Sequence, residues 1–511
     1  MNASTGDLSF LQVIDVLEVG PARVEKRRVI TPYKVIQGDR EVQNSLIYSY
    51  DEDVFAPRDP DSANLAHLIT AQVALNYGLF CKEIRFHGSY SRVDRRFLSD
   101  MMANTSREIY VNKLLRHNPF LIGQAANTPV VKRRNYTQAK ITFTEPIYES
   151  PAAAPGAAGW LMDPNKYTVM SSGGKESLLT FALLKELGRE AHPVYINESG
   201  RHWFTAVNGY RHFAATYPET ARVWMNTDRI FNWMLRQFPF IRQDFNTIRA
   251  DEYPIRLWTV AAFSLAAVPL LRKRETGRLL IGDEYDTTRH YHYEGIPHYD
   301  GLFDQSLDFD IAFSRYFQRK GWNIQQFSII RPLSELLVEK TLALRYPDLQ
   351  QHQVSCHLSH IDGERIRPCG HCEKCRRVVG MLTAVGVDPA RCGYTPEQID
   401  RCLKALLHGE LRQEKDGAQH MAFLLEQRGL APAGTGVEHA YIEKLRFDER
   451  APMTGIPQDL RPGLYRILLE HANGAMKRDG RRYADFDPFQ DPEIERPYSF
   501  DQKLTEDGTP A

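Results

Sequence analysis

The sequence predicts an α/β protein built around a five-stranded parallel sheet with helices on both of its faces. Three observations predict this fold. Short apolar runs alternate with helical patterns from residue 166 onward, a glycine-rich turn follows the first run, and a cluster of cysteines follows the last. Strands in a parallel sheet read as continuous apolar runs because helices cover both of its faces.

The expected strands of this sheet are mostly apolar and do not alternate with polar residues. Patterns typical of helices lie between them, and such a βαβα series predicts parallel strands. We assign this domain to residues 160–390. The runs are 167–171, 193–197, 222–226, 278–282 and 326–330, and the helices are 178–187, 228–236, 257–271 and 307–320.

Three further regions flank this domain. Residues 1–145 predict an α+β domain, which the Pro/Ala/Gly-rich linker 151–159 separates from the parallel sheet. Residues 391–480 predict a helical region, and residues 481–511, rich in Asp, Glu, Pro and Arg, predict an irregular tail. The N-terminal strands are expected at 10–19, 28–37, 45–50 and 83–87 with helices around 63–79 and 97–115, and the C-terminal helices at 376–385, 396–407, 418–427 and 460–476.

Composition argues against several classes of protein. Lysine plus arginine and aspartate plus glutamate each number 64, so the formal net charge at pH 7 is zero. This balance disfavours nucleic acid as the main partner, since such binding depends on excess positive charge. The best apolar run, 257–271, is shorter than the roughly 20 residues that cross a bilayer, and the N-terminus lacks a signal-peptide pattern. We therefore expect a cytoplasmic protein without a membrane segment.

A glycine-rich turn joins the strand that ends at Ser171 to the helix 178–187. Adjacent glycines let the backbone turn tightly and approach a ligand, and the first amides and the dipole of the next helix favour an anion. The serines and the lysine add donors and a positive charge, so the turn predicts a phosphate cradle. It does not have the spacing of a Walker A loop. The turn consists of Ser172, Gly173, Gly174, Lys175, Glu176 and Ser177.

Acidic residues follow another expected strand of the sheet. Asp283, Glu284 and Asp286 come directly after the run 278–282. Ligands of such sheets bind at the carboxyl ends of the strands, where these side chains would lie near the glycine-rich turn. Carboxylates next to a phosphate site predict Mg²⁺ binding.

Four of the seven cysteines have the spacing C-x₁₂-C-x₂-C-x₂-C. Thiolates at this spacing can surround one tetrahedral zinc ion, and the glycine after the second cysteine allows a tight turn. An iron–sulfur cluster, or replacement of one ligand by His360 or His371, are the alternatives. The expected Zn²⁺ ligands are Cys356, Cys369, Cys372 and Cys375.

The glycine-rich turn resembles the PP-loop, S-G-G-x-D-S, of the ATP pyrophosphatase family, with Glu176 in place of the usual aspartate. Together with the cysteine motif, it is similar to the 7-cyano-7-deazaguanine synthases, in which cysteines of this pattern bind zinc. The N-terminal α+β region and the segments 279–284, 304–309 and 327–335 resemble the ATP-dependent epimerases of UDP-N-acetylmuramoyl-L-alanyl-L-glutamate. The family resemblance covers about 165–385.

This resemblance implies an adenine nucleotide alpha hydrolase-like domain that splits ATP into AMP and pyrophosphate and adenylates a small carboxylate substrate with Mg²⁺. Ser171, Ser172, Gly173, Gly174, Lys175, Glu176 and Ser177 would bind ATP. The expected catalytic residues are Lys175, Ser177, Asp283, Glu284, Asp286 and Arg331. Arg331, like Arg289, could clamp the substrate carboxylate, because a guanidinium binds carboxylates bidentately. An epimerase would also need a base, for which His290, His292 and His298 are candidates.

Other functions stay open at this point. Replacement of aspartate by Glu176 would also fit a regulatory module that binds nucleotide without turnover. A tRNA- or nucleobase-modifying enzyme of the PP-loop type is a third alternative, which the zero net charge disfavours. The identity of the substrate, and whether the chain forms a homo-oligomer or binds a partner protein, are likewise open.

Overall fold

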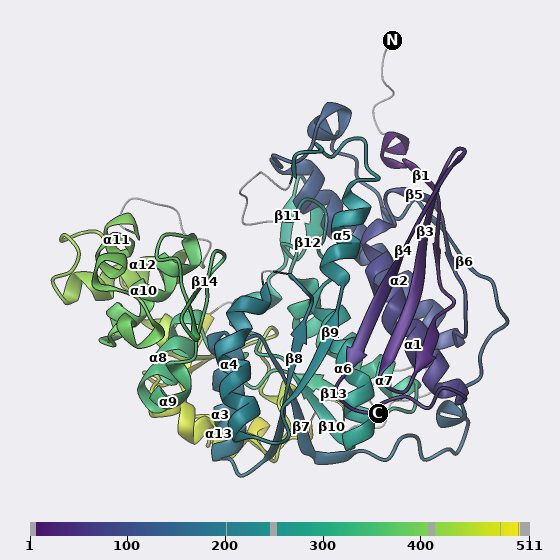
Figure 1. Ribbon diagram of the computed structural model, residues 1–511. Coiled ribbons are helices and arrows are strands. Elements are labelled where there is room, and N and C mark those ends of the chain that lie inside the picture. Colours follow the sequence, from purple (N-terminus) through teal and green to yellow (C-terminus); the bar gives the residue numbers. More distant parts are fainter. Residues whose placement is uncertain are drawn as a thin grey trace.

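The computed structural model describes residues 7–200, 202–245, 253–406, 414–480, 482–498 and 500. Five parallel strands form the centre of the molecule (Figure 1), which confirms the predicted α/β fold around a parallel sheet. The order is β13-β10-β7-β8-β9, so the chain reverses its direction of winding between β7 and β10. The strands are β7 (Asp163–Ser171), β8 (Glu190–Asn197), β9 (Ala221–Met225), β10 (Thr276–Leu280) and β13 (Gln325–Phe327).

Helices cover both faces of these strands. α3 (Lys175–Glu186) and α4 (His202–Thr216) share one apolar core with Tyr167 and Leu280. α5 (Thr227–Leu235), α6 (Val260–Arg274) and α7 (Leu307–Arg319) pack into the other core, on the opposite face. Right-handed crossovers on either side of the reversal place the helices in this way. α4 was not predicted from the sequence, because Asn208, Gly209, Arg211 and His212 interrupt its apolar and aromatic residues.

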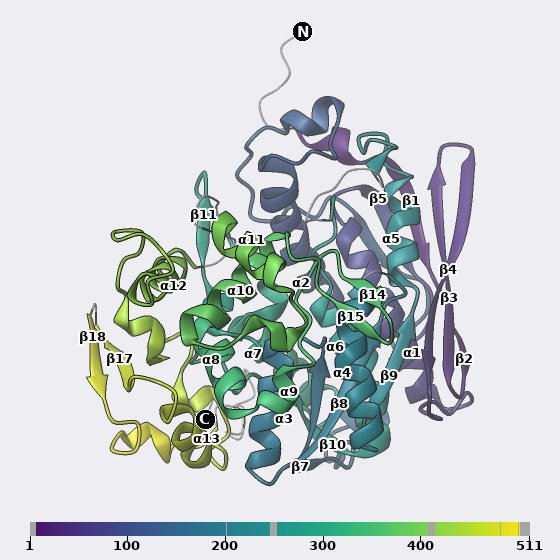
Figure 2. The ribbon, with the colours of Figure 1, turned by 60° about the vertical axis from the view of Figure 1, so that its left-hand side comes forward.

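The sheet continues beyond β9 into the N-terminal region, as Figure 2 shows for β9, β4 and β3. β4 pairs antiparallel with β9, for example Tyr48 with Met225, which produces one 11-stranded mixed sheet. The linker 151–159 therefore does not separate two sheets, and residues before and after it share a core that includes Leu68, Leu265 and Phe313. The added strands are β1 (Ile14–Val19), β2 (Arg23–Glu25), β3 (Arg28–Gln37), β4 (Arg40–Tyr50), β5 (Cys81–Phe86) and β6 (Lys140–Phe143), with helices α1 (Pro60–Ala71) and α2 (Arg92–Ile109).

The C-terminal region is helical in its first part and contains a small sheet in its second. The helix expected over 460–476 ends at Leu469, and a turn at Gly474, with φ +93°, leads into a strand. The prediction of an irregular tail is wrong over residues 482–486, which form an exposed strand. Its polar composition resembles that of an irregular segment. Residues 501–511 of the predicted tail lie outside the described residues. The elements are α8 (Glu335–Arg345), α9 (Pro347–Gln350), α10 (Glu373–Val385), α11 (Pro396–Leu406), α12 (Lys415–Gln427), α13 (Arg461–Leu469), β16 (Leu445–Phe447), β17 (Ala475–Asp479) and β18 (Arg482–Phe486).

The apolar run 257–271 contributes to α6, whose apolar residues are buried in the core. Across the described ranges, none of the helices combines the length and the hydropathy that a bilayer crossing requires.

Candidate functional site

A cavity of about 450 Å³ opens at the carboxyl ends of β7, β8 and β10. This is the point at which the strand order reverses, where doubly wound sheets bind their ligands. Nine of the residues predicted from the sequence line this cavity. They are Ser171, Ser172, Gly174, Lys175, Glu176, Ser177, Asp283, Glu284 and Cys356.

The glycine-rich turn is shaped by close backbone contacts. Gly173 has φ +75°, and a Cβ atom there would lie 2.7 Å from the carbonyl oxygen of Thr205, so only glycine fits without strain. Gly174 is the N-cap residue of α3 and supplies no side-chain cap for the first turn of the helix. The N-cap residue therefore makes no hydrogen bond to the first amides of α3, next to the cavity, and such amides can serve an anion; the Glu176 carboxylate accepts a hydrogen bond from its own amide.

A second close contact joins the end of β10 to this turn. A Cβ atom at Gly282 would lie 2.6 Å from Cβ of Glu176, so the backbone after β10 packs directly on the first turn of α3. Asp283 and Glu284 follow immediately and line the cavity. The acidic residues that follow β10 thus lie beside the glycine-rich turn, as predicted from the ends of the expected strands.

Lys175 lies at the centre of a group of glutamates. Its Nζ atom forms an ion pair with Glu176 and lies 3.0 Å from Glu284 Oε1 and 3.1 Å from Glu335 Oε1. Burial opposes the charge of the lysine, but the three carboxylates hold the pKa of Lys175 well above its usual value. One ammonium group facing three carboxylates leaves this part of the cavity with an excess of negative charge.

Two carboxyl groups of the cavity have pKa values that reflect this excess of negative charge. Burial, reinforced by neighbouring acids, raises the pKa of both Asp283 and Glu284 well above the usual value. Asp283 is only 2% exposed, and its Oδ2 atom has no hydrogen-bond partner; the nearest cation is Arg331, with Nη2 at 3.6 Å. A buried carboxylate oxygen without a partner attracts a cation.

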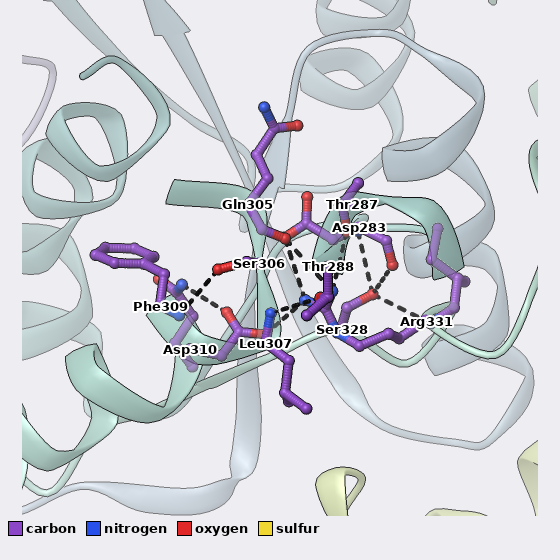
Figure 3. Close-up of polar contacts among 12 residues, drawn as sticks. Asp283, Thr287, Thr288, Gln305, Ser306, Leu307, Phe309, Asp310, Ser328 and Arg331 are labelled. Atoms are coloured by element: carbon purple, nitrogen blue, oxygen red, sulfur yellow. Dashed lines mark hydrogen bonds and ion pairs between the residues drawn. The ribbon is translucent and has the colours of Figure 1, made fainter. Parts of the chain in front are cut away.

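Arg331 does not line the cavity, and its guanidinium is occupied by protein groups (Figure 3). Nη2 donates to Asp310 Oδ2 at 2.7 Å, and Nη1 donates to Thr287 Oγ1 at 3.0 Å and to Thr288 Oγ1 at 3.1 Å. The arginine thus ties the segment after β10 to α7. This network makes it a residue that positions Asp283, whereas the sequence analysis offered it as a substrate clamp.

Other candidates also lie away from the cavity lining. Asp286 faces Glu335, Glu414 and Arg446, and burial raises its pKa. Arg289, the second candidate clamp, lies 3.6 Å from Glu414 Oε1 through Nη2.

The three candidate histidines lie on or next to the hairpin of β11 (Tyr291–Tyr293) and β12 (Ile296–His298), and none lines the cavity. His290 Nε2 lies 2.9 Å from Asp308 Oδ2, and burial lowers the pKa of His298 to about 4.

The four predicted cysteines converge on one point. Their sulfur atoms all lie within 4.8 Å of one another, with 3.5 Å between Cys372 and Cys375 and 3.8 Å between Cys369 and Cys375. A tetrahedral zinc ion with Zn–S bonds of about 2.3 Å requires sulfur atoms roughly 3.8 Å apart, so the cluster is compatible with zinc. Neither His360 nor His371 belongs to the cluster, and it is the one group of this kind among the described residues.

The four-cysteine cluster adjoins the cavity. Cys356 lines both, and Cys372 is the N-cap residue of α10, whose side chains at Lys374 and Arg377 also line the cavity. The hairpin of β14 (His360–Asp362) and β15 (Arg365–Arg367) fills the interval between the first two cysteines.

Sequence reasoning missed several lining residues. Glu335, Lys374 and Arg377 come from α8 and α10, far along the chain from the loop, and only the i, i+3 spacing of the last two hints at a shared helix face. Arg256 was also missed: its guanidinium lies 4.3 Å from the ring centroid of Phe231 and 4.6 Å from that of Tyr253, and it forms an ion pair with Glu198.

Comparison with known proteins leaves the family open: no protein-family model and no curated protein sequence matches the chain.

Proposed function

We propose that the chain is an enzyme that uses ATP and Mg²⁺ to adenylate a small carboxylate substrate, with release of pyrophosphate. The observation that supports this most directly is the meeting of two features in one cavity. A helix N-terminus with glycine at its N-cap, behind a glycine-rich loop, suits phosphate, and the buried carboxylates beside it suit a divalent cation. A magnesium nucleotide satisfies both, and the resemblance of Ser172–Ser177 to a PP-loop agrees with this.

In this reaction a carboxylate oxygen of the substrate attacks the α-phosphorus of ATP. The bond from that phosphorus to the bridging oxygen of pyrophosphate breaks, and an acyl-adenylate forms. Attack of water or ammonia on its acyl carbon then breaks the bond to the phosphate oxygen and releases AMP. The amides at the start of α3 and the ammonium of Lys175 would stabilise the negative charge on the β- and γ-phosphates.

The residues present fit a magnesium ion, because Asp283 has a buried oxygen without a hydrogen-bond partner and Glu284 and Glu176 lie beside it in the cavity lining. When bound, Mg²⁺ would neutralise charge on the leaving pyrophosphate.

The experiment that tests this proposal is a product analysis. The protein is incubated with ATP, Mg²⁺ and a pool of carboxylates that includes UDP-muramoyl dipeptide and 7-carboxy-7-deazaguanine, and the nucleotides are separated. We expect AMP and pyrophosphate to form only when the pool contains the substrate. Formation of ADP and phosphate, or ATP binding without any turnover, would contradict the proposal.

A variant of the loop ties the activity to this cavity. A Cβ atom at Gly174 would meet only side-chain atoms, Glu176 Oε2 at 2.8 Å and Ser172 Oγ at 3.4 Å, so the chain can fold around a larger residue. Gly174→Val should weaken ATP binding roughly a hundredfold or more, since it fills the place of the phosphate. Gly174→Ala is the matched smaller change and should weaken binding less. Equal ATP affinity in all three proteins would place the nucleotide elsewhere.

A further inference from the structure

One cation of the cavity differs from the others. Four lysine and arginine side chains line the cavity, and three of them, Lys175, Arg256 and Arg377, pair with glutamates. Lys374, the fourth, is partly buried and has neither a hydrogen bond nor an ion pair with any residue that the structure describes. A lysine ammonium group carries three hydrogen-bond donors and one positive charge. Because Lys374 uses none of them on a described residue, its ammonium group is available to a ligand in the cavity.

A metal ion in the four-cysteine cluster would fix the position of this lysine. Lys374 stands between Cys372 and Cys375, in the first turn of α10, and Arg377 follows one helical turn later on the same face. With cysteines of the cluster on both sides of Lys374, a bound ion would hold its backbone and thereby the direction in which the side chain leaves α10.

The charges around Lys374 explain why an oxyanion would need it. Lys175 is shared by three carboxylates, and Arg377 Nε lies 3.3 Å from Glu335 and 3.9 Å from Glu373. Both cations share their charge with acidic groups, so an incoming oxyanion gains less from them than from an unshared cation and meets an excess of negative charge on that side of the cavity.

We propose that Lys374 is the residue that binds an oxyanion of the ligand, and that the four-cysteine centre serves the cavity by presenting it. The inference rests on the proposed function for the identity of the cavity as a nucleotide site. The oxyanion is either a phosphoryl group of the nucleotide or the carboxylate of the substrate. In both cases Lys374 contributes a point charge, and the cysteine motif has a role in binding besides its role in folding.

The test is binding without turnover, measured by isothermal titration calorimetry. The probes are magnesium pyrophosphate, the ATP analogue α,β-methylene-ATP, in which the bond that would break is replaced, and malonate added to protein already saturated with this analogue. Lys374→Gln should weaken at least one of the three about tenfold or more, the loss expected when one charge-assisted contact is removed. Weaker binding of pyrophosphate and of α,β-methylene-ATP assigns the lysine to a phosphoryl group, and weaker malonate binding alone assigns it to the substrate carboxylate. Lys374→Arg should recover most of the loss.

Arg376→Gln is the matched control. It also removes one positive charge, two residues after Lys374, but the side chain of Arg376 does not line the cavity. It should leave all three affinities unchanged, and both variants should keep the metal content and melting temperature of the unmodified protein. Unchanged affinities in Lys374→Gln would overturn the inference. If the unmodified protein binds pyrophosphate yet forms no AMP, the proposed function fails while this test still decides the role of Lys374.

Discussion

Two buried lysines of this protein lie in opposite electrostatic environments. Lys320, the C-cap residue of α7, donates to Asn64 at 2.8 Å, to Ser91 at 3.3 Å and to its counter-ion Asp94 at 3.0 Å. Lys175 has three carboxylates around it, and burial raises the pKa of one of them, Glu284. The first group is balanced in charge and fully hydrogen-bonded, whereas the second carries surplus charge.

This difference in charge balance distinguishes a structural arrangement from a functional one. The ion pair of Lys320 and Asp94 is balanced without a ligand, and it joins α2 to α7 within one core. Surplus charge in a cavity is unfavourable until a ligand of opposite sign arrives, so a fold that keeps it is organised for binding.

The largest effect on stability is expected at the cysteine cluster. Its thiolates bind zinc as anions, so four negative charges meet at one point and depend on the metal for balance. Zinc contributes on the order of 10 kcal/mol to the folding of small zinc domains. Cys372→Ser should therefore lose the metal and unfold the segment that it organises, as measured by metal analysis and thermal melting. Cys81→Ser, the same change at a buried cysteine outside the cluster, should keep the metal. A Cys372 variant with full zinc content and an unchanged melting curve would contradict the assignment.

The balanced pair gives the next largest effect. Asp94→Asn keeps the shape of the side chain but leaves Lys320, which is fully buried, without its counter-ion. Breaking a buried ion pair on one side costs about 3–5 kcal/mol, so the free energy of unfolding in urea should fall by that amount. Nucleotide binding by the folded protein should not change. A loss below about 1 kcal/mol would show that hydrogen bonds, and not the charge, hold this group together.

The comparison also explains what could be predicted from the sequence. The strands after residue 166, the loop Ser172–Ser177 and the cysteine cluster were predictable, because each rests on local pattern or spacing. Arg331 looked like a free cation at a strand end, and only the fold brings Asp310 of α7 to it. Lys374 and Glu335 reach the loop through tertiary packing, which leaves no local pattern. The pairing of β4 with β9 depends on backbone hydrogen bonds that most side chains permit.

An intermediate case is Glu339, a fully buried carboxyl on α8 that accepts a hydrogen bond from Gln353 at 2.8 Å and has no ion pair among the described residues. Burial raises the pKa of Glu339 to about 7, from a usual value of 4.5. The folded protein thus holds a proton that the unfolded chain releases, and stability should fall as pH rises from about 4.5 to 7.

Glu339→Gln removes this titration while keeping an acceptor for Gln353. At pH 8 the variant should be more stable than the unmodified protein by up to roughly 3 kcal/mol, at about 1.4 kcal/mol for each unit of pKa. Near pH 4.5 the two should be equal. Urea unfolding at both pH values measures the difference, and a difference that does not depend on pH would mean that Glu339 is not the group that titrates.

The smallest effect on stability, with the opposite sign to that of Asp94→Asn, is expected for Glu284→Gln. Burial and the charges of Glu176 and Glu335 raise the pKa of Glu284, so the amide relieves repulsion while Lys175 keeps two carboxylate partners. The free energy of unfolding should stay the same or rise by about 1 kcal/mol. If the cavity binds magnesium nucleotide, the same change should lower AMP formation about a hundredfold. A stability loss like that of Asp94→Asn would mean that the glutamates around Lys175 are structural, and the contrast between the two lysines would then fail.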